Sequence, residues 1–179
     1  VSISGGNKDV KYFLSGSYDK QVGLIKQNPD VYQKYNLRSK IDFNINKWFK
    51  MSNNTSYFTS SYSFPGVGSV ENAFAYAARH ALASFPQKNP DGSWLYSTPL
   101  ISGSYNVANG RHIVYGNGNN YNMDKYNDFA NTTELKFTPI KQFNITANFT
   151  YRNYSTSYTN RQTKFDYRIY PDGPIEYYT

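Results

Sequence analysis

The segment Tyr35–Asn46 reads YNLRSKIDFNIN and is followed by KWF at residues 47–49. Its polarity alternates from residue to residue, and only a serine interrupts the apolar side, which carries Tyr35, Leu37, Ser39, Ile41, Phe43 and Ile45. The other side carries Asn36, Arg38, Lys40, Asp42, Asn44 and Asn46. A period of two is typical of a β-strand with one apolar and one polar face. A soluble β-sandwich buries the apolar face of such a strand against a second sheet, whereas an outer-membrane β-barrel turns it towards lipid.

The composition indicates an ordered chain with an unusual number of aromatic rings. Aromatic residues make up 18% of the chain, with 19 tyrosines and 12 phenylalanines, although only 39% of the residues are hydrophobic. Disordered chains contain few aromatic residues, and tyrosine rings suit a surface at a membrane boundary. The net charge is +7, but Lys and Arg are scattered singly, which does not favour a nucleic-acid partner. The absence of cysteine excludes disulfide bonds, thiolate metal sites and cysteine nucleophiles.

The spacing of strand-like segments favours the barrel. We predict six strands near residues 1–5, 10–19, 34–46, 49–62, 128–138 and 142–158. Short turns alternate with longer connections, which are expected at 20–33, 63–127 and 159–179. Barrels have short periplasmic turns and long extracellular loops, whereas a soluble meander has no reason to alternate. A strand of about 12 residues is about 40 Å long and crosses a hydrocarbon core of about 30 Å when tilted by about 45°.

The strand at 142–158 repeats the alternation of the opening segment, whereas the segment at 49–62 is rich in Ser, Thr and Asn on both sides. Aromatic residues gather where strands end, as in the two aromatic girdles of a barrel; Trp48, Phe49, Phe137 and Phe143 lie at the turns, and Tyr57, Phe58 and Tyr62 lie near the opposite ends. The residues predicted to face lipid are Tyr35, Leu37, Ile41, Phe43, Ile45, Phe143, Ile145 and Phe149.

The long connections are the predicted place of function. Residues 69–86 are rich in alanine, begin with the possible N-cap Ser69 and end at Pro86, so we expect a short helix there. Rings and planar polar groups of the 63–127 connection suit sugars and peptides alike. The predicted ligand contacts are Arg79, Trp94, Tyr96, Tyr105, Arg111 and Tyr115. The alternative is that these side chains only hold the long loop together.

No pattern in the sequence indicates catalysis. The two histidines, His80 and His112, have no second histidine or carboxylate at the spacing of metal ligands. There is no G-x-S-x-G motif, and the GNGNN at residues 116–120 is neither preceded by a strand nor followed by a helix. We therefore expect no enzyme activity, no metal and no cofactor.

Four stretches resemble the barrel of the SusC/RagA-type TonB-dependent outer-membrane transporters. The first two are SISGGNKDVKYFLSGSYDKQVGLIK at residues 2–26 and YNLRSKIDFNINKWFKMSNNTSY at residues 35–57. The later two are FPQKNPDGSW at residues 85–94 and ELKFTPIKQFNITANFTY at residues 134–151. The resemblance runs in the right order through most of the chain, and the first fifty residues are its most specific part.

The resemblance implies an all-β fold in which residues 1–179 form part of one antiparallel transmembrane β-barrel. Such barrels have about 22 strands and a plug, so the six strands here are expected to be an internal segment of a longer protein. The family imports oligosaccharides or peptides across the outer membrane of Gram-negative bacteria. It uses energy relayed by TonB through the plug, and a SusD-like surface lipoprotein serves as a lid.

The sequence is also compatible with two other interpretations of the function. The first is a secreted, soluble β-sandwich that binds carbohydrate through its aromatic loops. The second is a passive porin or an adhesin, which would share the barrel but have no plug. The sequence does not discriminate a glycan cargo from a peptide cargo.

Overall fold

The structure is a computed structural model, and it describes residues 1–26, 28–66, 70–80, 86–96, 107–110, 112–113, 116 and 118–178. Most of the described residues lie in β-strands, which form mostly antiparallel sheet, and few lie in helices. The predicted all-β class is therefore confirmed.

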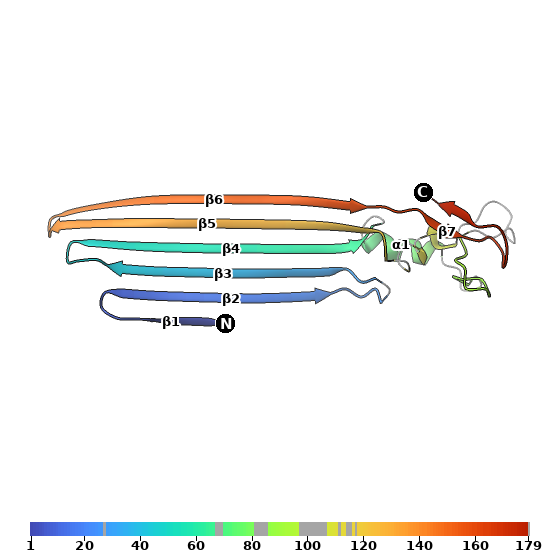
Figure 1. Cartoon of the computed structure of the whole chain (residues 1–179), viewed down its shortest axis with the longest axis horizontal. Helices are drawn as coiled ribbons and strands as arrows, with labels where there is room; N and C mark the ends of the chain where they lie inside the picture. Colours follow the sequence, from blue (N-terminus) through green and yellow to red (C-terminus); the bar gives the residue numbers. More distant parts are fainter. Residues whose placement is uncertain are drawn as a thin grey trace. The chain divides into compact units, whose positions relative to one another are not determined.

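Six strands form one sheet in sequential order, and neighbouring strands run in opposite directions (Figure 1). They are β1 (Ser2–Gly6), β2 (Val10–Val22), β3 (Val31–Asn44), β4 (Phe49–Pro65), β5 (Tyr121–Ile140) and β6 (Phe143–Arg161). All six predicted strands are present. The four from β3 to β6 are 14, 17, 20 and 19 residues long, which is far beyond the usual strand of about 5–6 residues.

Several predicted strand limits were wrong. The strands β2, β4, β5 and β6 extend beyond their predicted limits, so the connections expected at 20–33, 63–127 and 159–179 are shorter than predicted. Conversely, Ile45 and Asn46 belong to a turn rather than to β3. Both N–H groups donate to the carbonyl oxygen of Phe49, at 3.1 and 3.2 Å, and the Asn46 side chain accepts from the Trp48 N–H at 2.9 Å.

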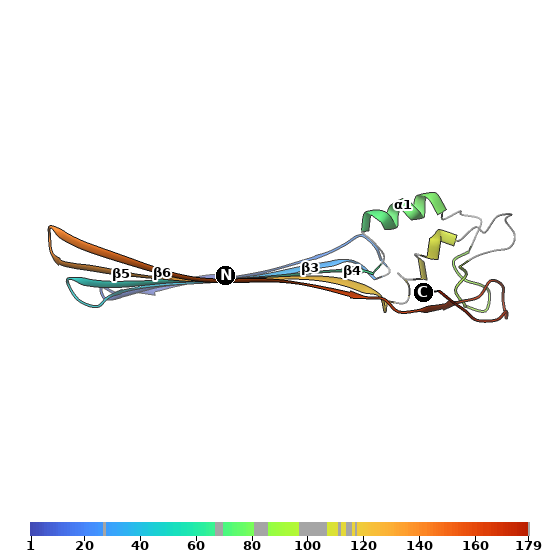
Figure 2. The ribbon, with the colours of Figure 1, turned by 90° about the horizontal axis from the view of Figure 1, so that it is seen from above.

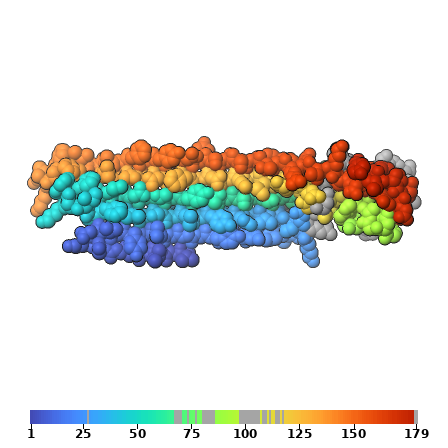
Figure 3. Space-filling view, in the orientation of Figure 1, coloured from blue at the N-terminus to red at the C-terminus, as the bar shows by residue number. Residues whose placement is uncertain are grey.

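The chain divides into two compact units. Unit 1 comprises residues 1–21, 32–62 and 124–157, and unit 2 comprises residues 22–31, 63–123 and 158–179. Every residue of unit 1 is described, and it contains only strands and the turns between them. Its sheet is a single twisted layer when seen edge-on (Figure 2). Its strands form adjacent bands in the space-filling view (Figure 3).

Side-chain contacts across β2 and β3 show which residues share a face of this sheet. The rings of Tyr18 and Tyr35 stack with their centres 4.7 Å apart. The amide of Asn36 instead donates to the hydroxyl of Ser17 at 3.1 Å, on the opposite face. The face with Tyr18 and Tyr35 therefore also carries Leu37, Ile41 and Phe43, because side chains alternate along a strand.

The same face continues over β4, β5 and β6. Leu37 and Thr55 line one groove, and the Thr55 hydroxyl accepts a hydrogen bond from the side chain of Asn131 at 2.7 Å. The rings of Phe129 and Tyr151 lie 6.3 Å apart, which joins the odd-numbered residues of β5 to those of β6. We call this surface the apolar face of unit 1.

Unit 2 contains the hydrophobic core of the described chain. Its elements are α1 (Val70–His80), the 3-10 helix η1 (Val107–Gly110) and an antiparallel pair of short strands, β7 (Phe165–Tyr167) and β8 (Glu176–Tyr178). Tyr96, Ile113 and Phe165 form a buried cluster. The helix α1 lies within the predicted 69–86 segment, of which residues 69 and 81–85 are outside the described residues. No helix in the described part of the chain combines the length and apolar character of a membrane-spanning segment.

Candidate ligand-binding site

A tight turn in unit 2 forms the centre of the candidate site. Its sequence, NPDGS at residues 89–93, is rich in the residues that favour turns. The Asn89 N–H donates to the Ser93 carbonyl, and the Gly92 N–H donates to the Asn89 carbonyl, both at 2.9 Å. Gly92 has a φ of 84°, which residues with a Cβ rarely adopt. The turn places the Asp91 carboxylate over the Ser93 backbone N–H (2.9 Å) and hydroxyl (2.6 Å), both of which donate to Oδ1.

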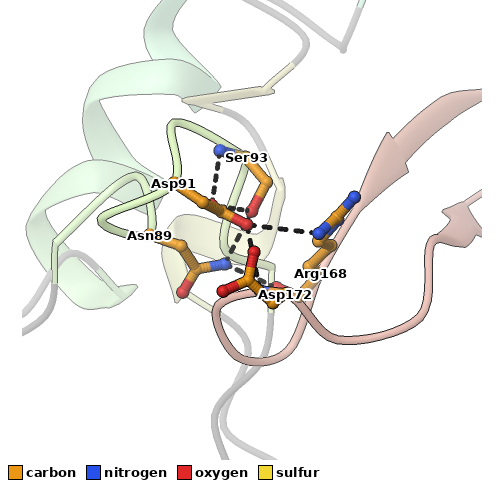
Figure 4. A network of polar contacts seen from close by, with 5 residues as sticks. All are labelled: Asn89, Asp91, Ser93, Arg168 and Asp172. Atoms are coloured by element: carbon orange, nitrogen blue, oxygen red, sulfur yellow. Dashed lines mark hydrogen bonds and ion pairs between the residues drawn. The ribbon is translucent and has the colours of Figure 1, made fainter.

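Residues 168–172, which are distant in sequence, donate hydrogen bonds to the other carboxylate oxygen of Asp91 (Figure 4). The Asp172 N–H donates to Asp91 Oδ2 at 3.1 Å, and the Arg168 Nη1 donates to the same oxygen at 3.3 Å. The Asn89 side chain also donates to the Arg168 carbonyl at 3.2 Å. The backbone continues the connection, because the Arg168 N–H donates to the Trp94 carbonyl at 2.8 Å. The two segments are thus joined by a continuous polar network.

These contacts determine the ionisation of the site. The hydrogen bond from the Ser93 hydroxyl, with those from the backbone N–H groups of Asp172 and Ser93 and the charge of Arg168, lowers the pKa of Asp91 to about 2. Burial, together with the hydrogen bond that its hydroxyl donates to Glu176 at 2.8 Å, raises the pKa of Tyr167 to about 12. At neutral pH the site therefore contains a charged Asp91 and a neutral Tyr167.

A pocket of about 520 Å³ lies beside the network, and its volume is within the range of small-ligand sites. Its lining residues are Asp91, Gly92, Ser93, Trp94, Asp166, Tyr167, Arg168, Asp172 and Ile175. Three carboxylates and one guanidinium supply both hydrogen-bond acceptors and donors. Such a lining can bind the hydroxyl groups of a sugar or the amides of a peptide, and it does not favour an anionic ligand.

Three of the six residues predicted to contact ligand are among the described residues, and each occupies a different kind of position. Trp94 lines the pocket, and the Lys88 ammonium lies 4.2 Å from the centre of its ring. Arg79 is exposed on α1. Tyr96 is only 7% exposed, and its ring centre is 4.9 Å from that of Tyr167, so its position suits core packing. The positions of Tyr105, Arg111 and Tyr115 lie outside the described residues.

The predicted ligand contacts do not include four charged residues that line the pocket: Asp91, Asp166, Arg168 and Asp172. The composition of NPDGS and of the PDG at residues 171–173 indicates two turns, and each segment does turn. Asp91 and Arg168 are 77 residues apart, however, and no local pattern indicates that they meet.

Within the described residues, no group of three or more His, Cys, Asp or Glu side chains is arranged to hold a metal ion. His112 is buried, and its Nε2 lies 2.8 Å from the Leu95 carbonyl oxygen. Burial lowers the pKa of His112, which keeps its ring neutral. The histidine therefore has a place in the core of unit 2 rather than in the pocket.

Comparison of the chain with models of known protein families, and with curated proteins, found no match in either case. The proposed function therefore rests on the sequence pattern and on the geometry of the two units.

Proposed function

We propose that the chain is a wall segment, with extracellular loops, of a SusC/RagA-type TonB-dependent transporter in a Gram-negative outer membrane. The transporter imports an oligosaccharide or a peptide. It acts with a SusD-like surface lipoprotein as a lid and with TonB through a plug region. The wall segment itself performs no catalysis, and the long loops contribute to ligand binding.

The observation that carries the proposal is the exposed apolar face of unit 1. Leu37 is 58% exposed and Phe149 is 69% exposed, Tyr35, Phe143 and Ile145 are exposed as well, and Ile41 and Phe43 are half-buried. Unit 1 has no second layer that could cover them. A contiguous apolar surface is unfavourable when it is exposed to water. In the wall of a membrane barrel the same surface contacts lipid.

Two rows of aromatic residues bound this face. The row farther from the short turns, which we call the upper row, crosses the five neighbouring strands β2 to β6. It consists of Tyr18, Tyr35, Tyr57, Phe129 and Tyr151. The lower row runs near the short turns and consists of Phe43, Phe49, Phe137 and Phe143. Trp48 adds to the lower row, because its ring centre is 5.1 Å from that of Phe137.

The separation of the two rows fits a membrane. In each strand from β3 to β6 the two aromatic residues are eight positions apart, as in Tyr35 and Phe43 or Phe143 and Tyr151. At about 3.3 Å per residue and a tilt of about 40°, eight residues rise by about 20 Å along the membrane normal. Outer-membrane barrels have an apolar band about 25 Å tall between aromatic girdles. The rows therefore support a membrane wall.

The soluble β-sandwich is the weaker candidate because a sandwich covers one face of each sheet with the other sheet. A passive porin or an adhesin would have the same barrel wall, so an uptake assay is needed to distinguish these proteins from a TonB-dependent transporter. In cells with the full-length protein, we expect accumulation of labelled oligosaccharide or peptide to stop when TonB is deleted. Continued accumulation without TonB would favour a passive pore.

A further inference from the structure

A closed set of side-chain hydrogen bonds joins β4 to β5. The Asn53 amide donates to Thr133 Oγ1 at 2.9 Å and to Asn131 Oδ1 at 3.3 Å. The Asn131 amide donates to Thr55 Oγ1 at 2.7 Å and to Asn53 Oδ1 at 3.2 Å. The Thr55 hydroxyl in turn donates to Asn53 Oδ1 at 3.0 Å. We call these four residues the asparagine clasp.

The asparagine clasp lies on the apolar face, between the two aromatic rows. Asn53 is four residues from Phe49 and four from Tyr57, so it stands midway between the rows. Both donors and the acceptor oxygen of each amide find partners within the clasp, so the clasp needs no further protein or ligand to satisfy it. Its bonds run between two strands of one sheet, which indicates a role within the wall.

The connection between β4 and β5 explains why such a role is needed. A tight turn fixes the register of a hairpin, but β4 and β5 are joined through residues 66–120. A slip of one residue would exchange the two faces, and the apolar pattern opposes it. A slip of two residues keeps every side chain on its face, so only specific pairs of side chains can oppose it.

We propose that the asparagine clasp fixes the register of β4 against β5. It keeps Tyr57 and Phe129 in one row and thereby aligns the upper and lower aromatic rows across the long connection. This role does not depend on the cargo or on TonB, and it goes beyond the proposed transport function.

Engineered disulfides in the full-length protein test the register, and residues 1–179 contribute no cysteine of their own. The backbone hydrogen bond from Thr138 to Trp48 and the side-chain hydrogen bond from Thr59 to Asn127, at 2.7 and 2.8 Å, define the register on both sides of the clasp. Counting from either end places Ser56 opposite Ala130. Ser56→Cys with Ala130→Cys reports the observed register, and Ser56→Cys with Thr132→Cys reports a slip of two residues.

With an intact clasp we expect the disulfide of the observed register to dominate. Asn53→Leu should raise the proportion of the slipped disulfide by about tenfold, because it removes several cross-strand hydrogen bonds. Asn54→Leu, the same change one residue further on the opposite face, should leave the proportion unchanged. Asn53→Thr serves as a milder variant, since a small polar side chain at this position is expected to preserve membrane assembly.

The proposal is overturned if neither Asn53→Leu nor Asn53→Thr increases the slipped disulfide, or if Asn54→Leu increases it equally. The disulfides are scored in both the membrane and the unassembled fractions, so poor assembly of one variant does not remove the readout. TonB-dependent uptake, measured with the unmodified protein, is a separate result and can fail while the register proposal stands.

Discussion

The substitution Ala147→Arg in β6 probes the lipid-facing assignment most sharply. Ala147 lies on the apolar face, four residues from Phe143 in the lower row and four from Tyr151 in the upper row. Four residues rise by about 10 Å at the usual tilt of barrel strands. Ala147 is therefore near the middle of the proposed membrane span, where a charge is most costly.

The expected magnitude follows from that depth. An arginine on the lipid face costs about 2–4 kcal/mol at the midplane and about 0–1 kcal/mol near the interfaces. The control is Asn148→Arg, which introduces the same side chain one residue further along β6 but on the polar face. A surface substitution of that kind usually changes stability by about 0.5 kcal/mol or less.

The assay is the free energy of unfolding of the full-length protein, measured by urea titration after folding into lipid vesicles. We expect Ala147→Arg to be destabilised by about 2–4 kcal/mol relative to the unsubstituted protein, and Asn148→Arg to be nearly unchanged. Equal effects of the two variants, or a larger effect at Asn148, would refute the assignment of the apolar face to lipid.

Three further predictions concern single side chains. Because the pKa of Asp91 is lowered to about 2 from an ordinary value near 4, its charge stabilises the turn above about pH 4, and this stabilisation is lost as the pH falls from about 4 to about 2. The protection of the Ser93 amide against hydrogen exchange, corrected for the intrinsic exchange rate, should fall over this pH range. Asp91→Asn should abolish this pH dependence. If the pH dependence persists in Asp91→Asn, another group causes it. Trp94→Ala should lower the apparent affinity of uptake without changing the amount of protein in the outer membrane, and unchanged affinity would exclude the ring as a ligand contact. Arg152→Ala breaks a bidentate pair with Asp128 on the polar face. Because the Arg152 side chain is largely exposed, we expect the free energy of unfolding in urea to change no more than it does for Asn148→Arg. A loss as large as that expected for Ala147→Arg would show that the pair is shielded from water.

The sequence predicts the faces of the sheet better than it predicts the limits of the strands. Alternation in 35–44 and 143–152 gives the two faces correctly, because a one-sided strand leaves a period of two in the sequence. The polar outer parts of β5 and β6 carry no such period. Their extent depends on backbone bonds to the neighbouring strand, which have no sequence signature.

The weak pattern of the 49–62 segment has a specific cause in the structure. Asn53 and Thr55 occupy apolar-face positions, and their polar groups are satisfied by Asn131 and Thr133 on β5. Read alone, the segment therefore lacks an apolar side. The polar residues are explained only by the pairing with β5, where Asn131 lies 76 residues after Thr55 in the chain.

The candidate site was predictable only in part for a similar reason. Turn chemistry indicates NPDGS and PDG separately, and Trp94 stands out as a large ring in a loop. The contact of Asp91 with Arg168 depends on how unit 2 folds as a whole. Tyr96 looks like Trp94 in the sequence, and only the structure separates the buried ring from the one that lines the pocket.

Accessibility along β6 tests the central claim, that unit 1 is a membrane wall, most directly. Single cysteines are introduced at each position from Asn144 to Thr150 of the full-length protein, which is then probed in outer membranes with a water-soluble maleimide and with a lipid-confined thiol reagent. We predict that positions 145, 147 and 149 react only with the lipid-confined reagent. Positions 144, 146, 148 and 150 should react with the water-soluble one. Reaction of 145, 147 and 149 with the water-soluble maleimide, or the absence of any alternation, would contradict the account.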